Sequence, residues 1–124
     1  MPKPKEIDFG FIHVDQKTWD LNIKPEEMNI KELASNLDIA YLDKKGTDDW
    51  NLTPRQLINE PEKEPDHYEK VQKADLKYPI KIYYFRGSWK ILDGVHRLCK
   101  AIIENRQTIM VCKVPPEMIP KITK

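Results

Sequence analysis

The sequence predicts an α+β fold, a small mixed β-sheet with helices packed against it. Two runs of alternating apolar and polar residues, 80–85 and 89–92, flank a glycine, which is the pattern of a β-hairpin. The next segment carries apolar residues at helical spacing, and a last apolar run over 108–114 ends at two prolines. This order of elements indicates one sheet, built from the hairpin and the last strand and covered by helices.

The first fifty residues contain few periodic patterns. Residues 9–14 are a short strand candidate. Asn29 followed by Glu32 has the spacing of a capping box, with Asn in place of Ser or Thr, so a short helix is expected over 31–37. Residues 42–46 then have the composition of a turn.

Two further short helices are predicted before the hairpin. Thr53 is a suitable N-cap for a helix over 54–59, because a proline follows it at the first helical position. An acidic connection with two prolines comes next, and Asp66 is expected to cap a helix over 68–74. This helix must end before Pro79, since the residue before a proline avoids the helical region.

The helix that begins at Val95 has the clearest pattern in the chain. Its apolar residues recur every three or four positions and form one stripe: Val95, Leu98, Cys99, Ile102 and Ile103. Three polar residues, His96, Arg97 and Lys100, lie outside that stripe. We therefore expect them to project outward near the start of the helix.

Length and charge limit the function classes. The 124 residues predict a single domain, 1–124, and no stretch approaches the ~20 apolar residues that span a bilayer. Because the N-terminus also lacks the apolar region of a signal peptide, a cytoplasmic protein without a membrane partner is expected. The net charge of +1 argues against a chain dominated by nucleic-acid binding.

The charge is unevenly distributed along the chain. Residues 1–80 carry 12 basic and 17 acidic side chains, whereas residues 81–124 carry 9 and 3. An anion is therefore expected to bind in the C-terminal third, unless the acidic part simply packs beside the basic part. Cys99 and Cys112 form no CxxC pair and are expected to be buried thiols. The three histidines have no metal-ligand spacing, so no protein metal site is predicted.

The start of the helix has the features of a phosphate site. A strand turns through Asp93 and Gly94 directly into the helix, whose first N–H groups lack internal partners and lie at the positive end of the helix dipole. Gly94 has no Cβ to keep an anion from the backbone, and His96, Arg97 and Lys100 are expected beside it. The alternative is an ordinary strand-to-helix junction with a solvated basic face, in which His96 and Asp93 are structural or capping residues.

The order of elements over 78–114 is distinctive. A strand opened by a proline, a glycine turn and a second strand lead into Asp-Gly-Val-His-Arg, residues 93–97, at a helix start. This stretch resembles the ParB/sulfiredoxin superfamily of nucleotide-binding domains, whose ParB-like branch often carries Asp-Gly-His-His-Arg at this position. The preceding helix also lies where that family has one, so the recognisable core is 66–114, and residues 1–50 are divergent or specific to one branch of the family.

The resemblance implies roles for individual residues. Gly94 and the backbone of Val95 and His96 would hold nucleotide phosphates, and Arg97 would contact them, with Lys100 as a further cation. Asp93 and His96 are the expected catalytic residues, Asp93 as a base or as a residue that orients a metal ion. A second carboxylate would come from the acidic connection, as one of Glu60, Glu62, Glu64 or Asp66, unless this connection is only a solvated loop.

Not every branch of the superfamily fits. Sulfiredoxin activity needs a cysteine where Val95 stands, and Cys99 lies on the apolar stripe, where burial disfavours a thiolate. The chromosome-partition branch carries Gly-Glu-Arg-Arg and continues into a helix-turn-helix domain, and neither feature follows here. The branch of free serine kinases and ParB-like proteins matches best, with Val95 as the one departure from its motif.

The expected function is nucleotide binding, with ATP or ADP, or CTP, and Mg²⁺ as cofactors of a small-molecule kinase or nucleotide hydrolase. A non-catalytic nucleotide-sensing or protein-interaction module, including a homodimer, is the alternative. A ParB-like nuclease or nucleic-acid-binding accessory is a further alternative, motivated by the basic C-terminal third. Trp50 and Arg55 are candidates for stacking on a base or binding an anion, although packing of the segment before the helix is the expected role of Trp50.

Overall fold

The computed structural model describes residues 3–123 and shows the predicted α+β fold with one four-stranded mixed sheet. The strands lie in the order β1-β4-β2-β3: β1 Glu26–Asn29, β2 Ile80–Phe85, β3 Ser88–Asp93 and β4 Thr108–Lys113. β4 runs parallel to β2 and antiparallel to β1, and β2 and β3 form the predicted hairpin. The helices are α1 Asp15–Trp19, α2 Pro54–Asn59, α3 Pro65–Lys73, α4 Val95–Ile103 and α5 Ile119–Ile122, with 3-10 helices η1 Lys5–Ile7, η2 Ile30–Asp38, η3 Pro61–Lys63 and η4 Pro116–Met118.

The prediction of a strand over 9–14 is wrong. Gly10 has φ +80 and turns the backbone out of the extended region, so only an isolated bridge between His13 and Thr123 forms. Phe9 and Phe11 instead pack against the ring of Tyr83 on the sheet.

The fourth strand of the sheet, β1, was not predicted. It is a short edge strand in which Met28 is the only buried residue, so it has no apolar alternation to detect. Its position is set by pairing with β4 rather than by its own pattern.

The helices begin close to their predicted positions. The side chain of Asn29 caps η2 by accepting from the N–H of Lys31, and Thr53 and Gln56 form a reciprocal capping box at α2. The assignment of Asp66 as an N-cap is wrong. Pro65 occupies the first turn, so α3 starts three residues earlier than expected and Asp66 lies inside it.

The apolar stripe of α4 is confirmed except at its C-terminal end, since Val95, Leu98, Cys99 and Ile102 all pack in the hydrophobic cores. Leu98, Cys99 and Ala101 are buried, whereas Ile103 is 40% exposed. The helix therefore contacts both the sheet, through Leu98 and Ala101, and the pair α2–α3, through Cys99. Both cysteines are buried free thiols, as predicted, and burial raises the pKa of Cys99 to about 12.

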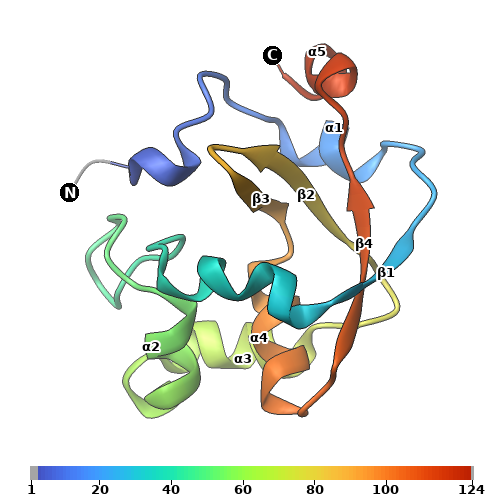
Figure 1. Cartoon of the computed structure of the whole chain (residues 1–124). Coiled ribbons are helices and arrows are strands. Elements are labelled where there is room, and N and C mark those ends of the chain that lie inside the picture. Colours follow the sequence, from blue (N-terminus) through green and yellow to red (C-terminus); the bar gives the residue numbers. More distant parts are fainter. Residues whose placement is uncertain (1–2, 124) are drawn as a thin grey trace.

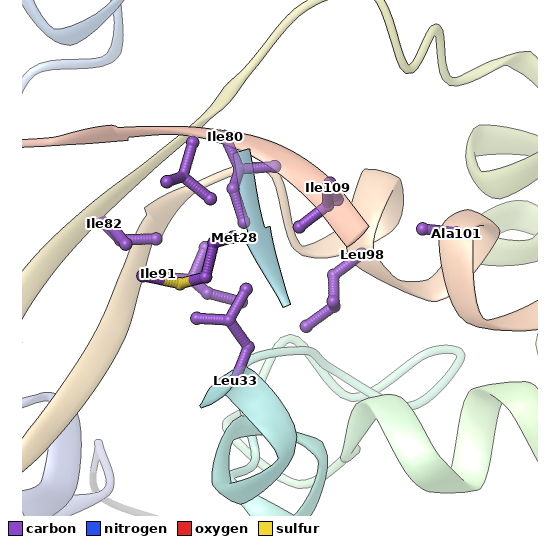
Figure 2. Packing of buried hydrophobic residues seen from close by; sticks show 9 residues of the cluster. Met28, Leu33, Ile80, Ile82, Ile91, Leu98, Ala101 and Ile109 are labelled. Carbon is purple, nitrogen blue, oxygen red and sulfur yellow. The ribbon is translucent and has the colours of Figure 1, made fainter. Parts of the chain in front are cut away.

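The main core lies between one face of the sheet, α4 and η2. Figure 2 shows Ile80, Ile82 and Ile91 of the hairpin meeting Leu98 of α4 and Leu33 of η2. The opposite face of the sheet is covered by the N-terminal segment and by the end of the chain, through Phe9, Leu92, Val114 and Ile122. In Figure 1, α2, α3 and α4 lie together at one end of the molecule, and α1 and α5 lie at the other end. Within residues 3–123, no helix is long and apolar enough to cross a membrane.

The outer edge of β3 is covered by side chains. Asn36 of η2 donates to the carbonyl of Trp89, and the N–H of Ile91 donates to the hydroxyl of Tyr41 at 2.9 Å. Tyr41 in turn donates to Asn36 at 2.6 Å. This network satisfies edge groups of the sheet and fixes Tyr41 beside the start of α4.

Candidate functional site

Gly94 begins α4 and has φ +114, in the region that favours glycine. No side chain caps this helix N-terminus. Gly94 takes part in the helical hydrogen bonds only through its carbonyl, which accepts from the N–H of Leu98. The N–H groups of the first turn therefore point away from the helix without a side-chain acceptor.

Packing explains the glycine. A Cβ at this position would lie 2.4 Å from Cγ2 and 2.8 Å from Cβ of Ile80, whose side chain is completely buried. The close contact between the start of α4 and β2 therefore requires a glycine here. The approach of an anion to Gly94 stays a prediction.

Arg97 is engaged within the protein rather than projecting outward. Its guanidinium donates to the carbonyls of Tyr78 and Pro79, at 3.1 and 2.8 Å, and to Asp93 Oδ2 at 2.8 Å. The Arg97 and Asp93 side chains are about one-fifth exposed. Arg97 thus ties the start of β2 to the end of β3, and Asp93 is its counter-ion.

Lys100 is also engaged. Its Nζ donates to the carbonyls of Gln72 and Ala74, at 3.0 and 2.6 Å, at the C-terminal end of α3. A cation at this helix end satisfies orphan carbonyls and complements the helix dipole. The predicted convergence of Arg97 and Lys100 on one anion is therefore not what the structure shows, because successive turns of α4 direct them to different neighbours.

His96 has the most distinctive surroundings of the predicted residues. Its Nε2 lies 3.0 Å from Nδ1 of His67 on α3, and Nε2 of His67 lies 2.8 Å from the carbonyl and 3.1 Å from Oδ1 of Asp43. The three residues form a continuous hydrogen-bonded chain that joins two helices to the loop before α2. Burial, together with His67 and the charge of Lys70, lowers the pKa of His96 to about 4.

A cavity of about 340 Å³ lies beside the start of α4. Its wall is formed by the segment 91–96, by the N-terminal segment and by the loop before α2, and includes Lys3, Phe9, His13, Tyr41, Trp50 and His96. Burial raises the pKa of the Tyr41 hydroxyl, so it stays protonated. Arg97 opens instead onto a separate hollow with Trp19 and Tyr78.

Lys3 and Trp50 contribute a cation and an aromatic ring to the cavity wall. Nζ of Lys3 lies 5.4 Å from the Trp50 ring and 5.7 Å from the Phe9 ring. Arg55, the other candidate anion ligand, pairs with Asp38 at 2.8 Å on the surface.

None of the four acidic candidates lines this cavity. Glu60 pairs with Lys63, and Glu64, although buried, accepts from the N–H of Lys45 at 2.7 Å. Glu62 and Asp66 are exposed. The carboxylate connected to His96 is Asp43, which the sequence analysis did not single out.

Asp43, His67, Tyr41 and Lys3 are thus the site residues that sequence reasoning missed. They lie up to 93 positions from His96 and share no spacing with it, so only the fold brings them together. The sequence around each of them shows no periodic pattern that would point to a shared site.

Within residues 3–123, no group of three or more His, Cys, Asp or Glu side chains is arranged to hold a metal ion. No protein-family model, no curated protein sequence and no solved structure matches this chain.

Proposed function

We propose that this protein binds a nucleotide in the cavity beside the start of α4. The observation that carries the proposal is the combination of three features in one cavity: an uncapped helix N-terminus, a lysine and an aromatic face. Each feature suits a different part of a nucleotide.

The phosphates would lie at the start of α4. Backbone N–H groups of Val95 and His96 and the helix dipole favour an anion there, and Nζ of Lys3 supplies a full positive charge to the same cavity. Arg97 and Lys100 would act only indirectly, by holding β2 and α3 against α4.

The base would stack on Trp50. Aromatic stacking tolerates any base, so ATP, ADP and CTP are all compatible with such a wall. Trp50 is half-buried and therefore offers part of its surface to the cavity.

The order of elements supports a ParB/sulfiredoxin-like core. The hairpin β2–β3, the left-handed glycine, helix α4 and the parallel strand β4 follow one another as the resemblance implies. On that basis we extend the proposal to a small-molecule kinase or nucleotide hydrolase that works in the cytoplasm, where the two free thiols would stay reduced.

Thermal stability with a panel of nucleoside di- and triphosphates, with and without Mg²⁺, tests binding. A nucleotide at 100 times its Kd stabilises by about 2.7 kcal/mol, which raises Tm by several degrees. Trp50→Ala and Lys3→Ala should reduce this shift. Trp19→Ala and Lys5→Ala are matched controls, because both residues are exposed and lie outside the cavity, and they should retain it.

Absence of a shift with every nucleotide would overturn the proposal. If one nucleotide binds, release or transfer of its phosphate distinguishes an enzyme from a sensing module. Turnover supports the kinase or hydrolase, and binding without turnover under all metal conditions supports the module.

A further inference from the structure

We infer that Asp43 and His67 position His96 as a general base that faces the cavity through Nδ1. This inference rests on the proposed function, because the acceptor of the activated oxygen is the phosphate of a bound nucleotide. His96 would be the catalytic residue, and His67 and Asp43 positioning residues.

The two imidazole rings meet edge to edge. Their planes are inclined by only 21°, and their centroids are 5.2 Å apart, close to the largest separation that a 3.0 Å contact between ring nitrogens allows. The contact is therefore an in-plane hydrogen bond rather than a face-to-face stack.

The direction of each hydrogen bond follows from Asp43. Its backbone carbonyl, 2.8 Å from Nε2 of His67, can only accept, so this nitrogen carries a proton and donates. Nδ1 of a neutral His67 is then an acceptor, which requires Nε2 of His96 to donate to it. A neutral His96 is left with a bare lone pair on Nδ1.

That lone pair is accessible. Among the described residues, Nδ1 of His96 has no hydrogen-bond partner, and no side-chain nitrogen or oxygen is both buried and unpartnered. Nδ1 is therefore in contact with solvent, on a residue that lines the cavity.

The step this arrangement supports is a proton transfer coupled to phosphoryl transfer. Water or a substrate hydroxyl gives its proton to Nδ1 of His96 as its oxygen bonds to phosphorus. The bridging P–O bond breaks, and its electron pair leaves with the shortened nucleotide. The positive charge on His96 is shared through Nε2–H with His67 and is stabilised by Asp43.

The charged groups around His96 set its pH response. Burial disfavours protonation of His96 most, Lys70 on α3 adds to this, and His67 would do so only when it is itself protonated. Asp43 acts through His67, and Asp93 is paired with Arg97. The low pKa of His96 keeps its ring neutral at pH 7 in the free protein. A bound phosphate would raise that pKa toward neutrality and make His96 a better base.

Long-range ¹H–¹⁵N NMR of the histidine rings tests the tautomer without any knowledge of the substrate. At pH 7 we expect a protonated Nε2 and a bare Nδ1 for His96. His67→Phe keeps an aromatic ring but removes the acceptor, so the two tautomers of His96 should then mix. His13→Phe, at a histidine of the same cavity wall, is the matched control and should leave the tautomer unchanged. Asp43→Asn should have a weaker effect than His67→Phe, because the Asp43 carbonyl still accepts from His67.

Nucleotide titration and turnover complete the experiment. The pKa of His96 should rise on nucleotide binding, and His96→Gln should lower kcat by about 10²–10⁴-fold with nucleotide binding retained. The kcat of His67→Phe should lie between those of His96→Gln and the unmodified protein. On acidification, the activity of His67→Phe should be lost at a different pH from that of the unmodified protein.

The outcomes separate the two claims. A protonated Nδ1, or a charged His96 at pH 7, overturns the relay whether or not nucleotides bind. Full turnover in His96→Gln overturns its role as the base. The predicted tautomer with no response to any nucleotide supports the relay but overturns the nucleotide as its substrate.

Discussion

At the scale of single residues, Gly94 has two reasons to be glycine. Its φ of +114 is strained for any L side chain, and a Cβ would overlap the buried side chain of Ile80. The turn residue Gly87 provides a useful contrast. It has φ +84 but open space around it, so only the backbone requirement applies there.

Gly94→Ala should therefore destabilise the fold by about 3 kcal/mol, from backbone strain plus overpacking. Gly87→Ala should lose only about 1 kcal/mol, the strain alone. Urea unfolding of both variants measures the difference. Equal losses would show that Ile80 moves aside and that packing does not require the glycine.

His96 shows why a residue's role depends on its partners. In the sequence it is one polar residue beside a glycine, compatible with a cap, a phosphate ligand or a base. In the proposed relay, His67 and Asp43 favour the base, because they would fix which ring nitrogen of His96 carries the proton.

At the scale of elements, Arg97 and Lys100 hold neighbouring elements against α4. Arg97 joins three acceptors from the start of β2 and the end of β3, and Lys100 satisfies the last carbonyls of α3. Neither side chain projects outward as a free cation would, because unpaired backbone carbonyls lie within reach of both. They position the uncapped start of α4, and with it the cavity.

Arg97→Lys should lower the stability of the ligand-free protein by about 1–2 kcal/mol, since an ammonium cannot match the three acceptors of the planar guanidinium. The nucleotide-induced rise in Tm should remain. Arg55→Lys is the control, because its ion pair with Asp38 is solvent-exposed, and no measurable change is expected. An unchanged free protein that no longer responds to nucleotide would instead make Arg97 a phosphate ligand.

At the scale of the whole molecule, most cations that the structure describes in the basic C-terminal third are buried or paired. Lys81 and Lys90 are buried, at 8% and 3% exposure. Other cations of this third are engaged with partners: Arg97 with Asp93, Lys100 with carbonyls, Arg106 with Glu104 and Lys113 with Glu26. Of these three ion pairs, only Lys113–Glu26, between β4 and β1, joins the acidic part of the chain to the basic part.

This arrangement predicts weak binding to nucleic acid. A labelled DNA duplex should bind with a Kd weaker than about 10⁻⁴ M at physiological salt, the weak end of non-specific binding. Fluorescence anisotropy at several salt concentrations checks this. A micromolar Kd that weakens steeply with added salt would instead favour the nucleic-acid alternative.

The elements with local signals could be predicted from the sequence. The glycine hairpin, helix α4, strand β4 and the proline-led α2 follow from periodicity and turn chemistry that a few neighbouring residues determine. The buried state of both cysteines follows from the same apolar pattern. Strand β1 escaped prediction because an edge strand with one buried residue has no alternation, and 9–14 failed because Gly10 turns the chain.

The candidate site likewise combines a feature that adjacent residues determine with contacts that only the tertiary structure determines. The sequence by itself determined that a strand turns through Asp93 and Gly94 into a helix with an open N-terminus, since that depends on adjacent residues. Only the tertiary structure decided which side chains reach it. Arg97 and Lys100 turn to backbone carbonyls, while His67 and Asp43 arrive from α3 and a distant loop. Side chains bind the nearest complementary group in space, and spacing along the chain carries no information about that group.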